Sequence, residues 1–169
     1  RPVRIWGKAD YFGALNFYSG TNVFNGKVSF AYTTRPRSSN GSTTVFGGGL
    51  YSGNYLTPGC FGTYPCDWII RNKPLDCRET LEMAGYLLLI LETPGNSVGG
   101  SGTGVLSLQG VDCRLDVRVD QAFSQPPRMF FGKTADGCKV LLNGHDLSVQ
   151  YLEVGVDAGT GLQGTADIG

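Results

Sequence analysis

Short runs of apolar or alternating residues recur along the chain and are separated by Gly, Asn, Asp and Pro. Each run has the length of a β-strand, and alternation of apolar and polar positions is typical of strands that bury one face. Regular spacing between short turns favours antiparallel pairing, so the pattern predicts an all-β fold, an antiparallel immunoglobulin-like or jelly-roll β-sandwich. The runs cover residues 15–18, 27–33, 43–46, 68–71, 86–92, 105–109, 113–119, 128–131, 138–142 and 147–154.

Local turn and capping signals add detail to this prediction. Asn25-Gly26 and Asn143-Gly144 each separate two strand-like runs, and Asn-Gly readily adopts the positive φ angles of a type I′ hairpin turn. One short helix is predicted over residues 76–85, with Asp76 as its cap, Glu79 at the capping-box position and Gly85 at its end. No internal repeat is apparent, so we expect a single domain over residues 1–169.

Composition narrows the classes of protein to which the chain can belong. The chain has 169 residues, with 14 basic and 14 acidic side chains and a net charge of zero, which gives no excess of cations for binding nucleic acid. Aromatic residues make up 11% and no Gly-X-Y or heptad period is visible, so disordered, collagen-like and coiled-coil chains are excluded. The longest apolar run, residues 83–91, is too short to span a bilayer and is expected to be a buried strand.

Five cysteines and a single histidine favour disulfides over a structural zinc site. Cys60 and Cys66 flank a small loop and are expected to form a local bridge. A second bridge is expected between Cys77 and Cys113 or between Cys113 and Cys138, which leaves one thiol unpaired. Disulfides point to a secreted protein, and the absence of a leader-like segment before the patterned sequence is expected to reflect its removal.

One motif resembles a catalytic site. Gly95-Asn96-Ser97-Val98-Gly99 matches the nucleophile-elbow pattern Gly-x-Ser-x-Gly, and His145 follows it along the chain. The residues after the motif are rich in glycine and disfavour the helix that such an elbow requires. A serine hydrolase that uses Ser97 is therefore kept as an alternative, and the chain is expected not to be an enzyme.

A sugar-binding site requires aromatic faces and a few fixed polar groups, and residues 51–73 are rich in both aromatic and polar side chains. Phe61 and Tyr64 are among these aromatic residues, but Phe61 is equally consistent with the core, and Trp68, at a strand-like position, is expected to lie in the core. The Gly-rich stretch 94–104 is expected to be either a flexible binding loop or a simple mobile connection.

A short cysteine loop followed by a strand resembles a segment in one branch of the receptor-binding domains of chaperone-usher fimbrial tip adhesins. Its sequence is Leu56-Thr-Pro-Gly-Cys60-Phe-Gly-Thr-Tyr-Pro-Cys66-Asp-Trp-Ile-Ile, and the likeness extends over residues 56–104. The resemblance implies a lectin-like β-sandwich at a pilus tip on the bacterial cell surface. It also implies pilus subunits as partners, through a pilin domain that is not recognisable in this chain.

Some members of that branch bind a metal through a His-x-His after the loop and a third His in the later Gly-rich loop. This chain has Asn72-Lys73-Pro74 at the first place and no histidine in residues 95–104, so no metal or cofactor is expected. We expect instead a non-catalytic domain that binds a host-surface glycan or glycoprotein and neither nucleic acid nor membrane. A structural minor pilin or capsid-like subunit is the main alternative. The expected ligand-binding residues are Tyr64, Asp67, Arg71, Asn72, Lys73, Asn96, Ser97 and Ser101.

Overall fold

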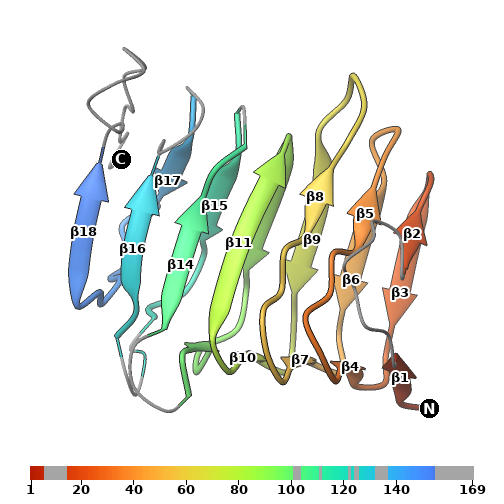
Figure 1. Ribbon diagram of the computed structural model, residues 1–169, viewed down its shortest axis with the longest axis horizontal. Helices are drawn as coiled ribbons and strands as arrows, with labels where there is room; N and C mark the ends of the chain where they lie inside the picture. Colours follow the sequence, from red (N-terminus) through yellow and green to blue (C-terminus); the bar gives the residue numbers. More distant parts are fainter. Residues whose placement is uncertain are drawn as a thin grey trace.

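The computed structural model describes residues 1–5, 15–100, 104–110, 112–121, 123, 126–131 and 137–154. Within these residues it contains eighteen strands and no helix. The strands form three parallel sheets that the chain visits in turn, and the result is a β-solenoid of about 6 turns. Figure 1 shows the strands stacked along the long axis of the molecule, with β1 at one end and β18 at the other.

Each sheet contains one strand from successive coils. Sheet 1 has the order β1 (Val3–Ile5), β4 (Val28–Phe30), β7 (Leu50–Ser52), β10 (Leu75–Cys77) and β13 (Ser97–Val98). Sheet 2 has the order β2 (Asn16–Phe17), β5 (Arg37–Ser38), β8 (Gly59–Cys60), β11 (Thr80–Gly85), β14 (Val105–Leu108), β16 (Arg128–Phe131) and β18 (Tyr151–Val154). Sheet 3 has the order β3 (Thr21–Phe24), β6 (Thr43–Phe46), β9 (Cys66–Ile70), β12 (Leu87–Leu91), β15 (Arg114–Val117) and β17 (Lys139–Leu141).

The predicted antiparallel sandwich is therefore wrong, because every strand pair between these elements is parallel. The strand pairing also reveals a repeat that was not expected from the sequence. Val28, Leu50 and Leu75 are neighbours in register, so two successive coils are 22 residues (28 to 50) and 25 residues (50 to 75) long. The repeat is difficult to see in the sequence because the coil length varies.

The interior is built from side chains that stack from coil to coil. Inward positions on sheet 3 include Thr44, Trp68, Leu89, Leu115 and Val140, which are successive partners in register and are all buried. At the N-terminal end of the stack the core is aromatic. There Phe46 lies 4.9 Å from Trp68 between ring centroids, and the Trp68 indole donates to Ser38 Oγ at 3.0 Å. The expectation that Trp68 lies in the core is confirmed.

Two buried amide side chains, those of Asn96 and Gln121, lie in the interior of the solenoid. Asn96 Oδ1 accepts a hydrogen bond from the Leu75 backbone amide at 2.7 Å. Asn96 Nδ2 donates to Gln121 Oε1 at 2.9 Å and to the Thr93 carbonyl at 2.6 Å. Both amide side chains are buried, and the hydrogen bonds satisfy groups that would otherwise be costly to bury.

The predicted helix over residues 76–85 is wrong, since this segment forms β10 and β11. The end of β11 bends into β12 at Gly85, whose φ is 65°. The capping-box residues fit a helix terminus locally, but residues 80–85 alternate between partly and fully buried positions, as a strand on a solenoid surface does. The run over residues 83–91 is buried strand as expected, divided between β11 and β12 by this corner.

Neither Asn-Gly pair forms a hairpin. Asn25-Gly26 leads from β3 of sheet 3 to β4 of sheet 1, so the strands on its two sides belong to different sheets. Asn143 and Gly144 do have the positive φ angles, 53° and 78°, that the pair was predicted to adopt. The predicted φ angles are thus confirmed at Asn143-Gly144, but the predicted hairpin is wrong, because the chain continues from β17 of sheet 3 to β18 of sheet 2.

Among the residues that the structure describes, no helix combines the length and the apolar character needed to cross a membrane.

Candidate functional site

The outer face of sheet 2 carries a hollow near the N-terminal end of the solenoid. Its volume is about 420 Å³, and below it is called the sheet 2 hollow. Two of its aromatic side chains are exposed to solvent, Tyr18 at 68% and Phe61 at 40%. The full lining consists of Asn16, Tyr18, Arg37, Ser38, Ser39 and Phe61.

Strand alternation determines which side chains reach this hollow. Phe17 and Ser38 point into the core and are buried, so their neighbours Asn16 and Arg37, which are partners in register, face outward. Tyr18, Ser39 and Phe61 follow directly after β2, β5 and β8, and backbone hydrogen bonds stack these coil segments. The Ser39 amide donates to the Phe17 carbonyl at 3.0 Å, and the Phe61 amide donates to the Ser38 carbonyl at 2.9 Å.

The Phe61 ring is held flat against the sheet by a glycine and a guanidinium group. A Cβ atom at Gly59 would lie 2.4 Å from Phe61 Cε2, so a residue with a side chain at this position would displace the ring. The Arg37 guanidinium carbon lies 4.6 Å from the Phe61 ring centroid, within the range of a cation–π contact. Phe61 therefore presents a fixed aromatic platform.

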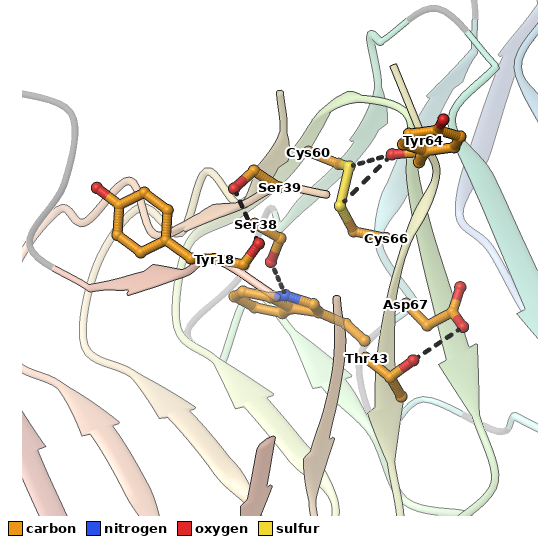
Figure 2. Close-up of a disulfide and its surroundings, with 9 residues drawn as sticks. Tyr18, Ser38, Ser39, Thr43, Cys60, Tyr64, Cys66 and Asp67 are labelled. Carbon is orange, nitrogen blue, oxygen red and sulfur yellow. Dashed lines mark hydrogen bonds between the residues drawn. A yellow bond between two sulfur atoms is a disulfide. The ribbon is translucent and has the colours of Figure 1, made fainter. Parts of the chain in front are cut away.

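A disulfide holds the loop that begins with Phe61. The Cys60–Cys66 bridge joins the end of β8 to the start of β9 across a corner, with 5.7 Å between the Cα atoms, which confirms the expected local bridge. Figure 2 shows the bridge between Tyr18 on one side and Tyr64 on the other. Both tyrosines are exposed, but only Tyr18 lines the sheet 2 hollow. The Tyr64 carbonyl oxygen lies 3.3 Å from Cys60 Sγ.

A second hollow continues on the other side of Phe61. Its volume is about 240 Å³, and its lining is Arg35, Thr57, Phe61, Glu82 and Ala84. Phe61 lines both hollows, which are neighbours over β5, β8 and β11; the two together are called the furrow below. Aromatic, amide, hydroxyl and guanidinium groups line this furrow, which is the mixture of apolar face and fixed polar groups that a sugar requires.

A larger hollow, of about 460 Å³, lies on the outer face of sheet 1. Lys27 Nζ sits 4.6 Å from the Tyr51 ring centroid, so a cation already occupies one side of that ring. Arg37 lies at the same distance from Phe61, so the two hollows differ instead in their exposed rings: Tyr32 lines the sheet 1 hollow, whereas both Tyr18 and Phe61 line the sheet 2 hollow.

The structure scatters the residues that were predicted to bind a ligand. Asp67 lies in β9 on sheet 3 and accepts a hydrogen bond from Thr43 Oγ1 at 3.4 Å. Arg71 forms an ion pair with Glu92 at the following corner, where Asn72 and Lys73 are exposed. The shared furrow takes none of its lining residues from this set.

The other predicted positions lie elsewhere again. Asn96 is 2% exposed and its amide is used inside the core, so it is a structural residue. Ser97 lies in β13 on sheet 1, where its register partner is Asp76 of β10. Ser101 lies outside the described residues.

The expected second disulfide does not form. Cys77, Cys113 and Cys138 are buried thiols. Burial raises the pKa of the Cys77 thiol to about 12, and burial also raises the pKa of Cys113 well above its usual value. Thiols with a raised pKa are protonated at neutral pH and are poor nucleophiles.

The serine motif is not assembled into a catalytic pair. His145 Nδ1 lies 3.1 Å from Asp120 Oδ1, and no hydrogen bond joins His145 to Ser97 in the part of the chain that the structure describes. The pKa of the Asp120 carboxyl is lowered, chiefly by the backbone amide of Asp146 and then by His145. Among the described residues, no group of three or more His, Cys, Asp or Glu side chains is placed to hold a metal ion.

Sequence reasoning left open whether Phe61 faces a ligand or the core and did not count it among the expected ligand-binding residues, and it missed Asn16, Tyr18, Arg37 and Ser39 altogether. These residues precede the cysteine loop by a whole coil or two, and only the coil register brings them beside it. Comparisons with protein-family models, with curated proteins and with solved structures found no match to this chain.

Proposed function

We propose that this β-solenoid is a non-catalytic glycan-binding module whose site is the sheet 2 hollow. One observation carries the proposal: the Tyr18 and Phe61 rings are exposed in the same hollow as the Asn16 amide, the Arg37 guanidinium and the Ser39 hydroxyl. Exposed aromatic rings that gather in one hollow are typical of an interaction site, because together they leave a contiguous apolar area in contact with water.

In this proposal the aromatic ring contacts the apolar face of the sugar, and the polar side chains bind its hydroxyl groups. The apolar face of a pyranose packs on the Phe61 ring, which Gly59 and Arg37 hold in place. Asn16 and Ser39 supply hydrogen-bonding partners for sugar hydroxyls at the edge of the same hollow. Because backbone hydrogen bonds fix the underlying strands, little conformational entropy is lost when a sugar binds.

The fimbrial setting has less support than glycan binding. The resemblance to tip adhesins implied a sandwich domain, and the chain forms a solenoid instead. Location at a pilus tip, a host-surface partner and secretion stay predictions. Glycan binding is proposed from the furrow alone.

The test is a microarray of linear polysaccharides that includes cellulose, xylan, chitin, hyaluronan and alginate types, followed by calorimetry on the types that bind. Tyr18→Ala is expected to weaken binding about tenfold, since it removes an exposed aromatic face. Tyr55→Ala is the matched control, because Tyr55 is also exposed, at 46%, and does not line the furrow. Absence of binding to every type, or equal losses in the two variants, would overturn the proposal.

A further inference from the structure

A second cluster of aromatic rings and an arginine lies on sheet 2, near the C-terminal end of the solenoid. The ring centroids of Phe130 and Tyr151 are 6.2 Å apart. The Arg128 guanidinium carbon lies 5.2 Å from the Phe130 centroid and 5.7 Å from the Tyr151 centroid. These three residues, called the Arg128 cluster below, repeat the aromatic and guanidinium combination of Phe61 and Arg37.

Register and burial place both groups on the same face of sheet 2. In β16, Met129 and Phe131 are buried, so Arg128 and Phe130 point outward. In β5, Ser38 is buried and Arg37 points outward. Figure 1 shows the strands of sheet 2 side by side along the long axis, so the outward positions of successive strands follow one another along the molecule.

The surface between the two groups is connected strand by strand. The second hollow reaches from Phe61 to Glu82 of β11. Glu82 pairs in register with Ser107 of β14, and Ser107 pairs with Phe130 of β16. Ser107 is only 2% exposed and accepts a hydrogen bond from Gln109 Nε2 at 2.8 Å, so between the two groups a ligand passes over Ser107 without a contact to its hydroxyl.

The two groups are too far apart for one sugar. In sheet 2, three strand spacings separate β8 from β16 and four separate β8 from β18, which corresponds to about 14 Å and about 19 Å at the usual distance between strands. A ligand that touches both Phe61 and Tyr151 must therefore consist of several sugar units, and it must run across the strands.

We propose that the outer face of sheet 2 binds a linear polysaccharide along the solenoid axis, with the sheet 2 hollow and the Arg128 cluster as two separate subsites. This inference rests on the proposed function and adds to it the length of the ligand and its direction. Contacts at two subsites on one rigid chain raise the affinity, because binding at the second subsite follows without a further loss of translational freedom. The affinity therefore increases with oligosaccharide length until the chain spans both subsites, and it is constant beyond that length.

The experiment measures binding of disaccharide, tetrasaccharide and hexasaccharide fragments of the polysaccharide type that binds on the array. In the unaltered protein the hexasaccharide is expected to bind about tenfold or more tightly than the disaccharide. Tyr151→Ala is expected to remove this gain and to leave disaccharide binding unchanged. Tyr18→Ala is expected to weaken the binding of all three fragments.

The outcomes separate the two proposals. Equal affinity for all three fragments, or a hexasaccharide affinity unaffected by Tyr151→Ala, overturns the second subsite and leaves glycan binding at the sheet 2 hollow intact. Failure of every polysaccharide type to bind overturns both proposals. Tyr151 is 49% exposed on a strand at the edge of its sheet, so its removal leaves the core unchanged, and a thermal unfolding curve checks this.

Discussion

Gly85 stands where β11 ends and the chain turns from sheet 2 into sheet 3. Its φ of 65° is rare for residues with a side chain, and a Cβ atom there would lie 1.9 Å from the Cys60 carbonyl oxygen. That oxygen accepts a hydrogen bond from the Tyr86 amide at 3.2 Å, so it cannot move away without loss of a contact between coils. The position therefore requires glycine for two reasons, backbone conformation and space.

Gly85→Ala is expected to destabilise the protein by more than about 3 kcal/mol, since it combines a strained φ with a backbone clash. Gly20→Ala is the matched control, because Gly20 has a φ of 72° and a Cβ atom added there would meet no atom within 4 Å. The control is expected to cost only about 1 kcal/mol, from the strained φ alone. Urea denaturation measures both values, and equal losses would show that the clash at Gly85 is relieved without cost.

Glu92 is a charged residue at the corner between sheets 3 and 1. Arg71 and Arg118 lie on either side of it, with Arg118 Nη1 at 3.1 Å from Glu92 Oε1. The hydrogen bond from Arg71 is the main cause that lowers the pKa of the Glu92 carboxyl, and Arg118 contributes further. A carboxyl whose pKa is lower in the folded state stabilises the fold above its unfolded pKa, and this contribution is lost as the pH falls through the folded pKa.

The free energy of unfolding is therefore expected to fall between about pH 5 and pH 3 by up to about 1 kcal/mol more in the unaltered protein than in Glu92→Gln. The value is small because the arginine partners are about half exposed to solvent. Urea titrations at a series of pH values test this, with Glu79→Gln as a control at an exposed carboxyl. Identical pH profiles for the unaltered protein and Glu92→Gln would contradict it.

The positions of single strands could be predicted from the sequence, whereas their pairing could not. Residues 43–46 and 128–131 coincide with β6 and β16, the run 68–71 overlaps β9, and each of the other predicted runs contains a strand. Alternation shows that a strand buries one face, but it is the same for antiparallel and parallel neighbours on a surface. Strands as short as β5 and β8, each of two residues, carry no alternation signal of their own.

Most residues of the sheet 2 hollow could not be predicted from the sequence, because they become neighbours only through the parallel strand pairing, which the sequence did not indicate. Residues of the cysteine loop were recognised because they are dense in the sequence, but Asn16 and Arg37 become neighbours only through parallel register. In a parallel stack the neighbours of a side chain lie a whole coil away, and the coil length changes from turn to turn. Local density therefore drew attention to Phe61 without deciding between a core and a binding position, and it did not identify the other residues of the sheet 2 hollow.

The Cys60–Cys66 bridge closes a short loop at one corner, so its contribution to stability is limited. Its sequence separation is 6, for which the loss of loop entropy in the unfolded chain corresponds to about 2 kcal/mol. The double variant Cys60→Ala/Cys66→Ala is expected to lose about that amount in urea denaturation and to keep its β-rich circular dichroism spectrum. Reductant is expected to destabilise the unaltered protein equally and to leave the variant unchanged. Loss of the solenoid signal in the variant would show that the bridge is needed for folding.

Stacked coils make most of their contacts with adjacent coils, so the stability of a solenoid is expected to vary along its axis. Strands in the middle have neighbours on both sides: β12 pairs with β9 and with β15 in parallel register. β18 is at the edge of sheet 2, pairs with β16 alone among the described strands, and has all four of its residues exposed. Local opening is therefore easiest at the β18 end, which carries Tyr151 of the Arg128 cluster.

Backbone amide hydrogen exchange followed by mass spectrometry measures this gradient. Amides of β9 and β12 are expected to exchange through global unfolding and to be the slowest, whereas amides of β18 exchange at least about tenfold faster through local opening. Binding of a polysaccharide that reaches the Arg128 cluster is expected to slow exchange both in β18 and in β9, because local opening of β18 and global unfolding each break the ligand's contacts. Uniform exchange along the axis would show that the coils open as one cooperative unit, and the Arg128 cluster would then be as rigid as the sheet 2 hollow.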